Sequence, residues 1–295
     1  MNTKRLLLVA IFCLIPSFLS IGQSLYQDGI LHKQPPKVPQ YVTFAGDTIR
    51  FDRSDLYERM DRELIAFTYM HTNSLLMLKR SNKYFSMVVP ILKKNGIPED
   101  LKYLMAIESN LDPHARSTAG AIGLWQFTKS TATQYGLEVG TEVDERYHIE
   151  KETEAACKFL KEAKAKYKDW MTVAASYNAG QGGISRRIAD QGEDSALDLL
   201  LVEETSRYMF RILVAKLFFE NPQSFGFFIT DDEKYPYIAP KKTVDVTGSI
   251  PSLVEFAKKN GVTYRQLKEA NLWLRDTKLT NKTGKKYTIT IPQNK

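Results

Sequence analysis

The chain has 295 residues, of which 43% are apolar and 25% are charged. A chain of this length and apolar content can bury a sizeable core, so the composition excludes intrinsic disorder and favours one large domain with a smaller one. The net charge is +7 at pH 7. Because the basic residues are scattered among acidic ones instead of forming a dense block, a nucleic-acid partner is not expected.

Residues 1–22 have the organisation of a secretory signal peptide. Lys4 and Arg5 precede an apolar run over residues 6–15, and the small residues Ser20 and Gly22 follow near a cleavage point. The alternative is a retained membrane anchor, although a run of about ten apolar residues is short against the ~20 that span a bilayer. The pattern therefore predicts an exported, periplasmic protein.

Removal of residues 1–22 takes away two basic residues and leaves 39 basic against 34 acidic residues, a net charge of +5. A mildly basic exported protein is expected to associate with anionic surfaces, either the cell wall or the outer membrane. Only Cys157 then remains, so an intramolecular disulfide and a cysteine-based zinc or redox site are excluded. No phosphate loop, nucleotide fingerprint or metal cluster is apparent, and no cofactor is expected.

The body of the chain reads as helical. Residues 23–54, with three prolines, form a tether and N-terminal extension, and residues 55–222 form the large domain. Strand patterns are nearly absent from that domain. Helices are expected over residues 55–94, from Pro98 onward, and over residues 151–166, 170–178 and 204–220.

A second unit follows a linker over residues 223–241. Within residues 242–293, a strand over 243–246 is followed by a helix from Ser252 to Lys259, a second helix capped by Thr263 and a closing strand over 286–292. The predicted order is strand, helix, helix, strand.

Glu108 is the candidate catalytic residue. Pro98 starts a helix whose apolar stripe through Leu101, Leu104 and Met105 continues to Glu108, just before Asp112-Pro113 breaks the helix. Burial and the negative end of the helix dipole both disfavour an ionised carboxylate and raise its pKa. A general acid that works near neutral pH requires such a raised pKa. The alternatives are a structural ion pair between Glu108 and a buried arginine such as Arg116, or a carboxyl group that extends to solvent at the helix end.

Aromatic and amide side chains accompany this acid. A glycine-containing turn over residues 120–127 carries Trp125 and Gln126, and residues 177–180 place Tyr177 and Asn178 beside a helix-terminating glycine. Aromatic rings stack on sugar faces and amides bind hydroxyl and acetamido groups, so the set suits a carbohydrate-binding cleft.

Four blocks in this order resemble the soluble-lytic-transglycosylase-like domains of the lysozyme superfamily, closest to the membrane-bound lytic murein transglycosylase D group. The blocks are residues 106–110, 117–127, 175–180 and 204–208. The resemblance implies a mainly α, goose-type lysozyme-like catalytic domain that cleaves peptidoglycan glycan strands. It also implies that Glu108 is the single catalytic acid and base and that the substrate-binding residues are Ser109, Ser117, Gln126, Tyr177, Asn178 and Tyr208. The alternative is a purely structural role in the core for three aromatic residues, Trp125, Phe127 and Tyr208.

The resemblance further implies cleavage of the β-1,4 bond between N-acetylmuramic acid and N-acetylglucosamine without water. Protonated Glu108 donates to the linking oxygen, and the ionised form then takes the proton of the muramic C6 hydroxyl as that oxygen attacks C1, giving a 1,6-anhydro sugar. Retaining glycosidases with a carboxylate nucleophile need a second acid. Asp112 is the nearest candidate in sequence, but with Pro113 behind it a turn-forming role is expected.

The second unit resembles a LysM module, a small α+β domain of β-α-α-β form that binds peptidoglycan or chitin. Residues 246–248, 253–257, 261–263 and 289–292 carry the resemblance. The usual Gly-Asp-Thr near the start of the module is replaced here by Gly248-Ser249-Ile250. The LysM fold is therefore expected, and retention of sugar binding is less strongly expected. A non-catalytic wall-binding scaffold is the competing hypothesis for the whole chain.

Overall fold

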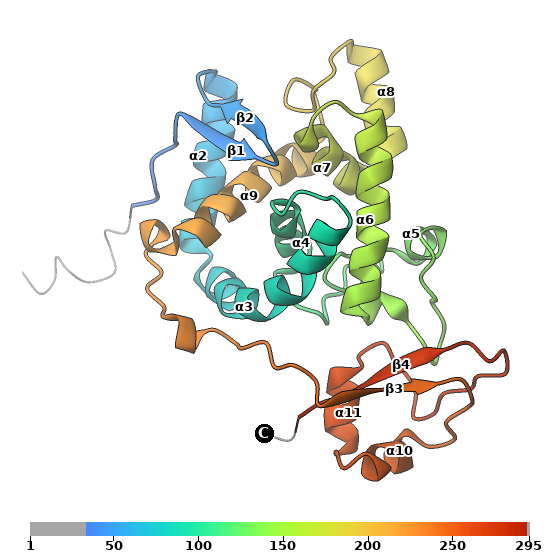
Figure 1. Ribbon diagram of the computed structural model, residues 1–295. Helices are drawn as coiled ribbons and strands as arrows, with labels where there is room; N and C mark the ends of the chain where they lie inside the picture. Colours follow the sequence, from blue (N-terminus) through green and yellow to red (C-terminus); the bar gives the residue numbers. More distant parts are fainter. Residues whose placement is uncertain (1–33, 294–295) are drawn as a thin grey trace, which may run out of the picture.

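The computed structural model describes residues 34–293. The predicted signal peptide and residues 23–33 of the tether lie outside these residues. Figure 1 shows a large helical body and a smaller C-terminal unit beside it. The elements in chain order are β1 (Tyr41–Phe44), β2 (Asp47–Arg50), α2 (Ser54–Tyr69), α3 (His71–Lys94), α4 (Leu101–Ser109), α5 (Lys129–Gln134), η1 (Glu145–Tyr147), α6 (Ile149–Lys166), α7 (Trp170–Ala179), α8 (Gln181–Gln191), α9 (Glu203–Glu220), η2 (Pro222–Phe225), η3 (Asp231–Glu233), β3 (Lys242–Val246), α10 (Leu253–Lys259), α11 (Tyr264–Ala270) and β4 (Tyr287–Ile291).

The helical body is organised around α4, which lies in its interior (Figure 1). The predicted apolar stripe is confirmed, because Leu101, Leu104 and Met105 are fully buried. This short helix contacts α3 and α9. Asp100 at its start also pairs with Lys216 of α9 at 2.8 Å. The helix that carries Glu108 is therefore held on several sides by the core.

The β1–β2 hairpin belongs to the same core as the helices. Its turn, Ala45-Gly46, has positive φ at both residues, the conformation of a tight hairpin turn. Val42 and Phe44 are buried in the helical core. The hairpin also binds the helices by hydrogen bonds, since Ala45 N–H donates to Asp100 and Trp170 N–H donates to Asp47. The core thus begins before residue 55, where the sequence pattern places the start of the domain.

The segment expected as an extended linker also packs against the body. Phe225 and Phe227 are buried in the helical core, and Tyr235 N–H donates to the Lys79 carbonyl at 2.8 Å. Residues 236–240 are exposed and lead to the C-terminal unit, where Lys241 N–H donates to the Ile291 carbonyl. The helical pattern predicted over residues 55–94 is two helices, α2 and α3, broken at Met70.

The C-terminal unit has the predicted β-α-α-β order. β3 and β4 pair antiparallel, with Val244 opposite Ile289. Ser252 and Thr263 accept hydrogen bonds from the third backbone N–H of α10 and α11, as N-caps do. Within residues 34–293, none of the helices combines the length and apolarity that crossing a membrane requires.

Candidate active site

Glu108 lies in the last turn of α4, as predicted. The helix ends at two successive residues in the left-handed region, Asn110 (φ 51°) and Leu111 (φ 54°). Backbone in this region is uncommon for residues other than glycine and clusters at functional sites. The Asn110 carbonyl accepts a hydrogen bond from Arg80, which fixes this helix end.

The Glu108 carboxyl group is half-buried and meets the phenol of Tyr208. Tyr208 comes from α9 and is 3% exposed; its hydroxyl donates to Oε1 of Glu108 at 2.5 Å. Burial raises the pKa of Glu108 to about 7, against the opposing effects of the Tyr208 hydrogen bond and the Arg211 charge. Glu204 raises it further. Half of the carboxyl groups are therefore protonated near neutral pH, as a general acid requires.

The contacts test two other hypotheses for this region, the Glu108–Arg116 ion pair and the role of Asp112. Among residues 34–293, Arg116 forms no ion pair with Glu108, so the structural ion pair is not present. Asp112 is occupied elsewhere, because one oxygen accepts from Arg80 at 3.1 Å and the other from the His114 N–H at 2.9 Å. Asp112 thus organises the turn after α4, as predicted.

The loop over residues 117–127, called here the glutamine loop, holds two further candidates. Gln126 has φ 52°, and its amide nitrogen donates to the carbonyls of Ala115 and Gly123. Ser117 is exposed and accepts the Ala121 N–H at 3.0 Å. Ser117 therefore shapes the turn of the loop, whereas the Gln126 side chain is fixed in one orientation by the carbonyls of two other residues.

Tyr177 and Asn178 lie at the end of α7. The Tyr177 hydroxyl donates to the Trp125 carbonyl at 2.8 Å, and its ring packs against Phe159 at 4.9 Å between centroids. Burial, followed by the charge of Glu108, raises the pKa of the Tyr177 phenol well above its usual value. Asn178 accepts from the Thr205 hydroxyl at 2.8 Å. Tyr177 thus joins the glutamine loop to the surroundings of Glu108, and Asn178 joins α7 to α9.

Three residues have their side chains in the interior. Ser109 is 4% exposed and donates to the Met105 carbonyl of its own helix. Trp125 is fully buried and donates to Thr153, and Phe127 is 2% exposed. For Trp125 and Phe127 the structural alternative therefore describes their position.

The sequence pattern missed the residues that hold the glutamine loop. Glu152, in the first turn of α6 and fully buried, accepts the N–H groups of Leu124 and Trp125, each at 3.2 Å. Arg146 donates to the carbonyls of Gly120 and Phe127. An acid in the first turn of a helix is ordinary on dipole grounds, so Glu152 carried no signal of this role.

A concave surface on the described part of the chain includes candidate residues. A pocket of about 580 Å³ is lined by Asn178 and Thr205, with Glu204 and two arginines of α8, Arg186 and Arg187. It opens beside the contact between α7 and α9. Glu204, which lines this pocket, also raises the pKa of Glu108 through its charge.

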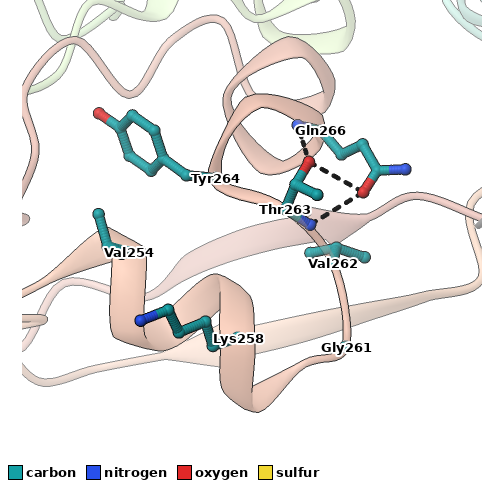
Figure 2. Close-up of a pocket in the computed structure, with 7 residues that line it drawn as sticks. All are labelled: Val254, Lys258, Gly261, Val262, Thr263, Tyr264 and Gln266. Atoms are coloured by element: carbon teal, nitrogen blue, oxygen red, sulfur yellow. Dashed lines mark hydrogen bonds between the residues drawn. The ribbon is translucent and has the colours of Figure 1, made fainter.

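A further pocket, also of about 580 Å³, lies between α10 and α11 of the C-terminal unit (Figure 2). Its polar groups are largely occupied, since Thr263 and Gln266 bind each other in a capping box. The pocket contains none of the candidate residues and offers mainly apolar surface from residues such as Val254 and Val262.

Comparison with known proteins assigns both parts of the chain. Residues 89–199 match the family described as "Transglycosylase SLT domain", and residues 242–295 match "Soluble lytic transglycosylase C-terminal LysM-like domain". Membrane-bound lytic murein transglycosylase D of Escherichia coli K12 is 28% identical over 191 residues, which cover 62% of this chain and 41% of that protein. Peptidoglycan transglycosylase gp16 of Escherichia phage T7 is 39% identical over 92 residues, 30% of this chain and 7% of that protein.

A third relative is named for a different property. A putative tributyltin chloride resistance protein of Alteromonas sp. M-1 is 29% identical over 112 residues, 38% of this chain and 54% of that protein. Of membrane-bound lytic murein transglycosylase D, the chain covers about two fifths of the length. It carries a transglycosylase SLT domain followed by a C-terminal LysM-like domain, and it is distantly homologous to membrane-bound lytic murein transglycosylase D.

Proposed function

We propose that the protein is an exported lytic transglycosylase that cleaves the β-1,4 bond between N-acetylmuramic acid and N-acetylglucosamine in peptidoglycan. The observation that carries the proposal is the half-buried Glu108 carboxyl group, with its pKa raised to about 7 and a tyrosine hydroxyl 2.5 Å away. The SLT domain match over residues 89–199 includes Glu108, Gln126, Tyr177 and Asn178.

Glu108 acts as acid and then as base. In its protonated form it donates to the glycosidic oxygen as the bond from C1 to that oxygen breaks. The carboxylate that remains accepts the proton of the muramic C6 hydroxyl as that oxygen bonds to C1. The proton count is balanced, and Glu108 ends the cycle protonated. A pKa near the working pH makes both halves of this exchange favourable.

The attacking group comes from the substrate. The nearest acid in sequence, Asp112, is engaged with Arg80 and a backbone N–H, which supports a mechanism without a carboxylate nucleophile. Tyr208 stabilises the ionised form of Glu108 by its hydrogen bond. Gln126, Tyr177 and Asn178 are proposed to bind the sugars, Ser109 and Ser117 to shape the cleft, and the LysM-like unit to bind the wall.

The products of purified peptidoglycan decide the reaction. Mass spectrometry of the released muropeptides is expected to show 1,6-anhydromuramic ends. Reducing ends in their place, or incorporation of oxygen from labelled water, would identify a hydrolase. Release of no fragments by the wild-type protein would favour the scaffold hypothesis.

A further inference from the structure

The C-terminal unit is bound tightly to one segment of the helical body. Residues 138–148, called here the bridging segment, connect α5 to α6 and run along the C-terminal unit. Asp144 N–H donates to the Trp273 carbonyl at 2.9 Å, and Arg275 N–H donates to the Glu142 carbonyl at 2.8 Å. Val143 is 3% exposed and is buried in the hydrophobic core of the C-terminal unit. The two units therefore share backbone hydrogen bonds and part of a core.

Side chains extend this interface on both sides of the backbone contact. The Arg275 guanidinium lies 4.2 Å from the centroid of the Tyr147 ring. His148 and Trp273 stack with 5.6 Å between ring centroids and 25° between planes. Lys285 lies 3.2 Å from Glu145. Such a combination of apolar, stacked and charged contacts is typical of a fixed interface, whereas a module on a free tether has none.

The opposite side of the bridging segment holds the glutamine loop. Asp144 and Arg146 form a buried bidentate ion pair, with contacts of 2.9 and 2.7 Å. The same guanidinium donates to the Gly120 carbonyl at 3.1 Å and to the Phe127 carbonyl at 3.3 Å. Gly120 and Phe127 stand near the two ends of the turn that carries Gln126.

We propose that the C-terminal unit is a positioning part of the active site. Trp273 fixes the backbone of Asp144, Asp144 fixes Arg146, and Arg146 holds the glutamine loop at both ends. Every link in this series is a hydrogen bond between buried or half-buried groups. The inference rests on the proposed function, because it assigns to the unit a share in the cleavage itself and not only in holding the wall.

The positioning role of the C-terminal unit follows because an active site tolerates little movement of its substrate-contacting groups. The bridging segment is held by the C-terminal unit on one side and holds the loop on the other, so a shift of the unit is transmitted to Gln126. A displacement of about 1 Å of a substrate-contacting group costs up to roughly 100-fold in rate. A docked unit that removes this freedom raises kcat on any substrate, including one too short to reach the unit.

The test weakens the interface without touching either core. In the full-length protein, Arg275→Glu/Lys285→Glu replaces the cation over Tyr147 and places a carboxylate against Glu138 and Glu145, and both side chains are exposed. The matched control, Lys259→Glu/Arg265→Glu, makes the same charge change on the solvent side of α10 and α11. Arg275→Lys/Lys285→Arg keeps both cations and serves as the rescue.

Two readouts are compared on folded proteins. On a soluble glycan tetramer, kcat of the interface variant is expected to fall between about 5-fold and 100-fold below the control and the rescue variant. Amide hydrogen exchange over residues 120–127 is expected to become faster in the interface variant alone. A variant that matches the control in both measurements, and differs only in its rate on insoluble wall, overturns the proposal and leaves a wall-tethering role.

The exchange measurement separates this inference from the proposed function. If the wild-type protein cleaves no glycan, the proposed function fails, whereas faster exchange of the glutamine loop still shows that the two units are coupled. If the wild-type protein cleaves and the loop does not respond, the coupling fails and the function stands.

Discussion

The phenol of Tyr208 and the carboxyl group of Glu108 are in direct contact at 2.5 Å although 100 residues separate them in the chain. α9 and α4, which carry the two residues, pack against each other in the core. This contact opposes the effect of burial on the carboxyl group, because a hydrogen bond to the ionised form lowers a pKa that burial raises. The acidity of Glu108 is thus set by two elements at once.

Replacement of Glu108 by Gln keeps the shape of the side chain and removes the exchangeable proton. We expect kcat for wall digestion to fall by about 100-fold to 10,000-fold, the range that general acid–base catalysis contributes. Binding of the variant to purified wall should be retained, as measured by sedimentation with insoluble peptidoglycan. Digestion at the wild-type rate would remove Glu108 from its proposed role.

The same substitution is expected to change how stability depends on pH. The carboxyl pKa is about 7 in the folded protein against an ordinary value of 4.5. Below pH 4.5 both states keep the proton; between the two values the unfolded chain loses it first, so the folded state loses stability as the pH rises. The loss is complete above about pH 7 and amounts to about 3 kcal/mol at most.

Urea unfolding at about pH 5 and about pH 8 measures this effect. The free energy of unfolding of Glu108→Gln should rise relative to wild type between the two conditions. Glu162→Gln is the control without such a change, because hydrogen bonds from Tyr135 and Lys166 lower the pKa of Glu162 from its ordinary 4.5, so this carboxyl group is ionised in the folded and unfolded states at both conditions. Parallel behaviour of the two variants would contradict the burial of Glu108.

Replacement of Tyr208 by Phe removes the hydroxyl and keeps the ring in the core. Without the hydrogen bond that lowers it, the pKa of Glu108 should rise above about 7. The alkaline limb of the kcat profile against pH should therefore move to higher pH, with a fall in maximal rate of about 10-fold or more from the lost interaction with an ionised group.

Tyr135→Phe is the matched control for this variant, since the Tyr135 hydroxyl donates to Glu162 at 2.8 Å on another part of the body. Its pH profile should coincide with that of the wild type. A limb that moves to lower pH in Tyr208→Phe would show that the hydroxyl does not stabilise the ionised carboxylate.

Replacement of Gly123 by Ala should displace the glutamine loop. Gly123 has φ +88°, and a Cβ atom there would lie 2.0 Å from the Arg146 carbonyl oxygen and 2.4 Å from a carboxylate oxygen of Glu152. Both neighbours are buried, so the loop must move, and we expect a loss of about 1–3 kcal/mol in the free energy of unfolding. Activity should fall with it.

The control for this prediction is Gly182→Ala in α8, where an added Cβ meets nothing within 4 Å. Alanine in a helix is favoured over glycine by up to about 1 kcal/mol, so this variant should match or exceed the wild type in melting temperature. Equal stability of the Gly123 and Gly182 variants would contradict the tight packing of the loop.

The helices and the acid were accessible from the sequence because their signals are local. The stripe through Leu101, Leu104 and Met105 fixes the buried face of α4 and so the position of Glu108. Likewise, Ser252 and Thr263 mark the starts of α10 and α11 by their capping chemistry. α8 was missed because its glycines weaken helical propensity and only Ile184 is buried.

Contacts between segments that are distant in the chain could not be predicted from such local signals. Glu152 and the Asp144–Arg146 pair are charged residues in a charged stretch, and their burial depends on the glutamine loop lying against them. The docking of the C-terminal unit on residues 138–148 has no local pattern either. Strand and helix periods report which face of an element is buried, but not what covers it.

Gln126 has a definite polarity toward a ligand. With its nitrogen donating to two carbonyls, the side-chain oxygen is the atom that remains, and none of the residues between 34 and 293 donates to it. An incoming molecule meets a lone pair there and not an N–H. The amide hydrogen of an N-acetyl substituent satisfies such an acceptor, whereas a carboxylate that approaches the same oxygen is repelled, so this one atom should favour a substituent that donates a hydrogen bond over one that only accepts.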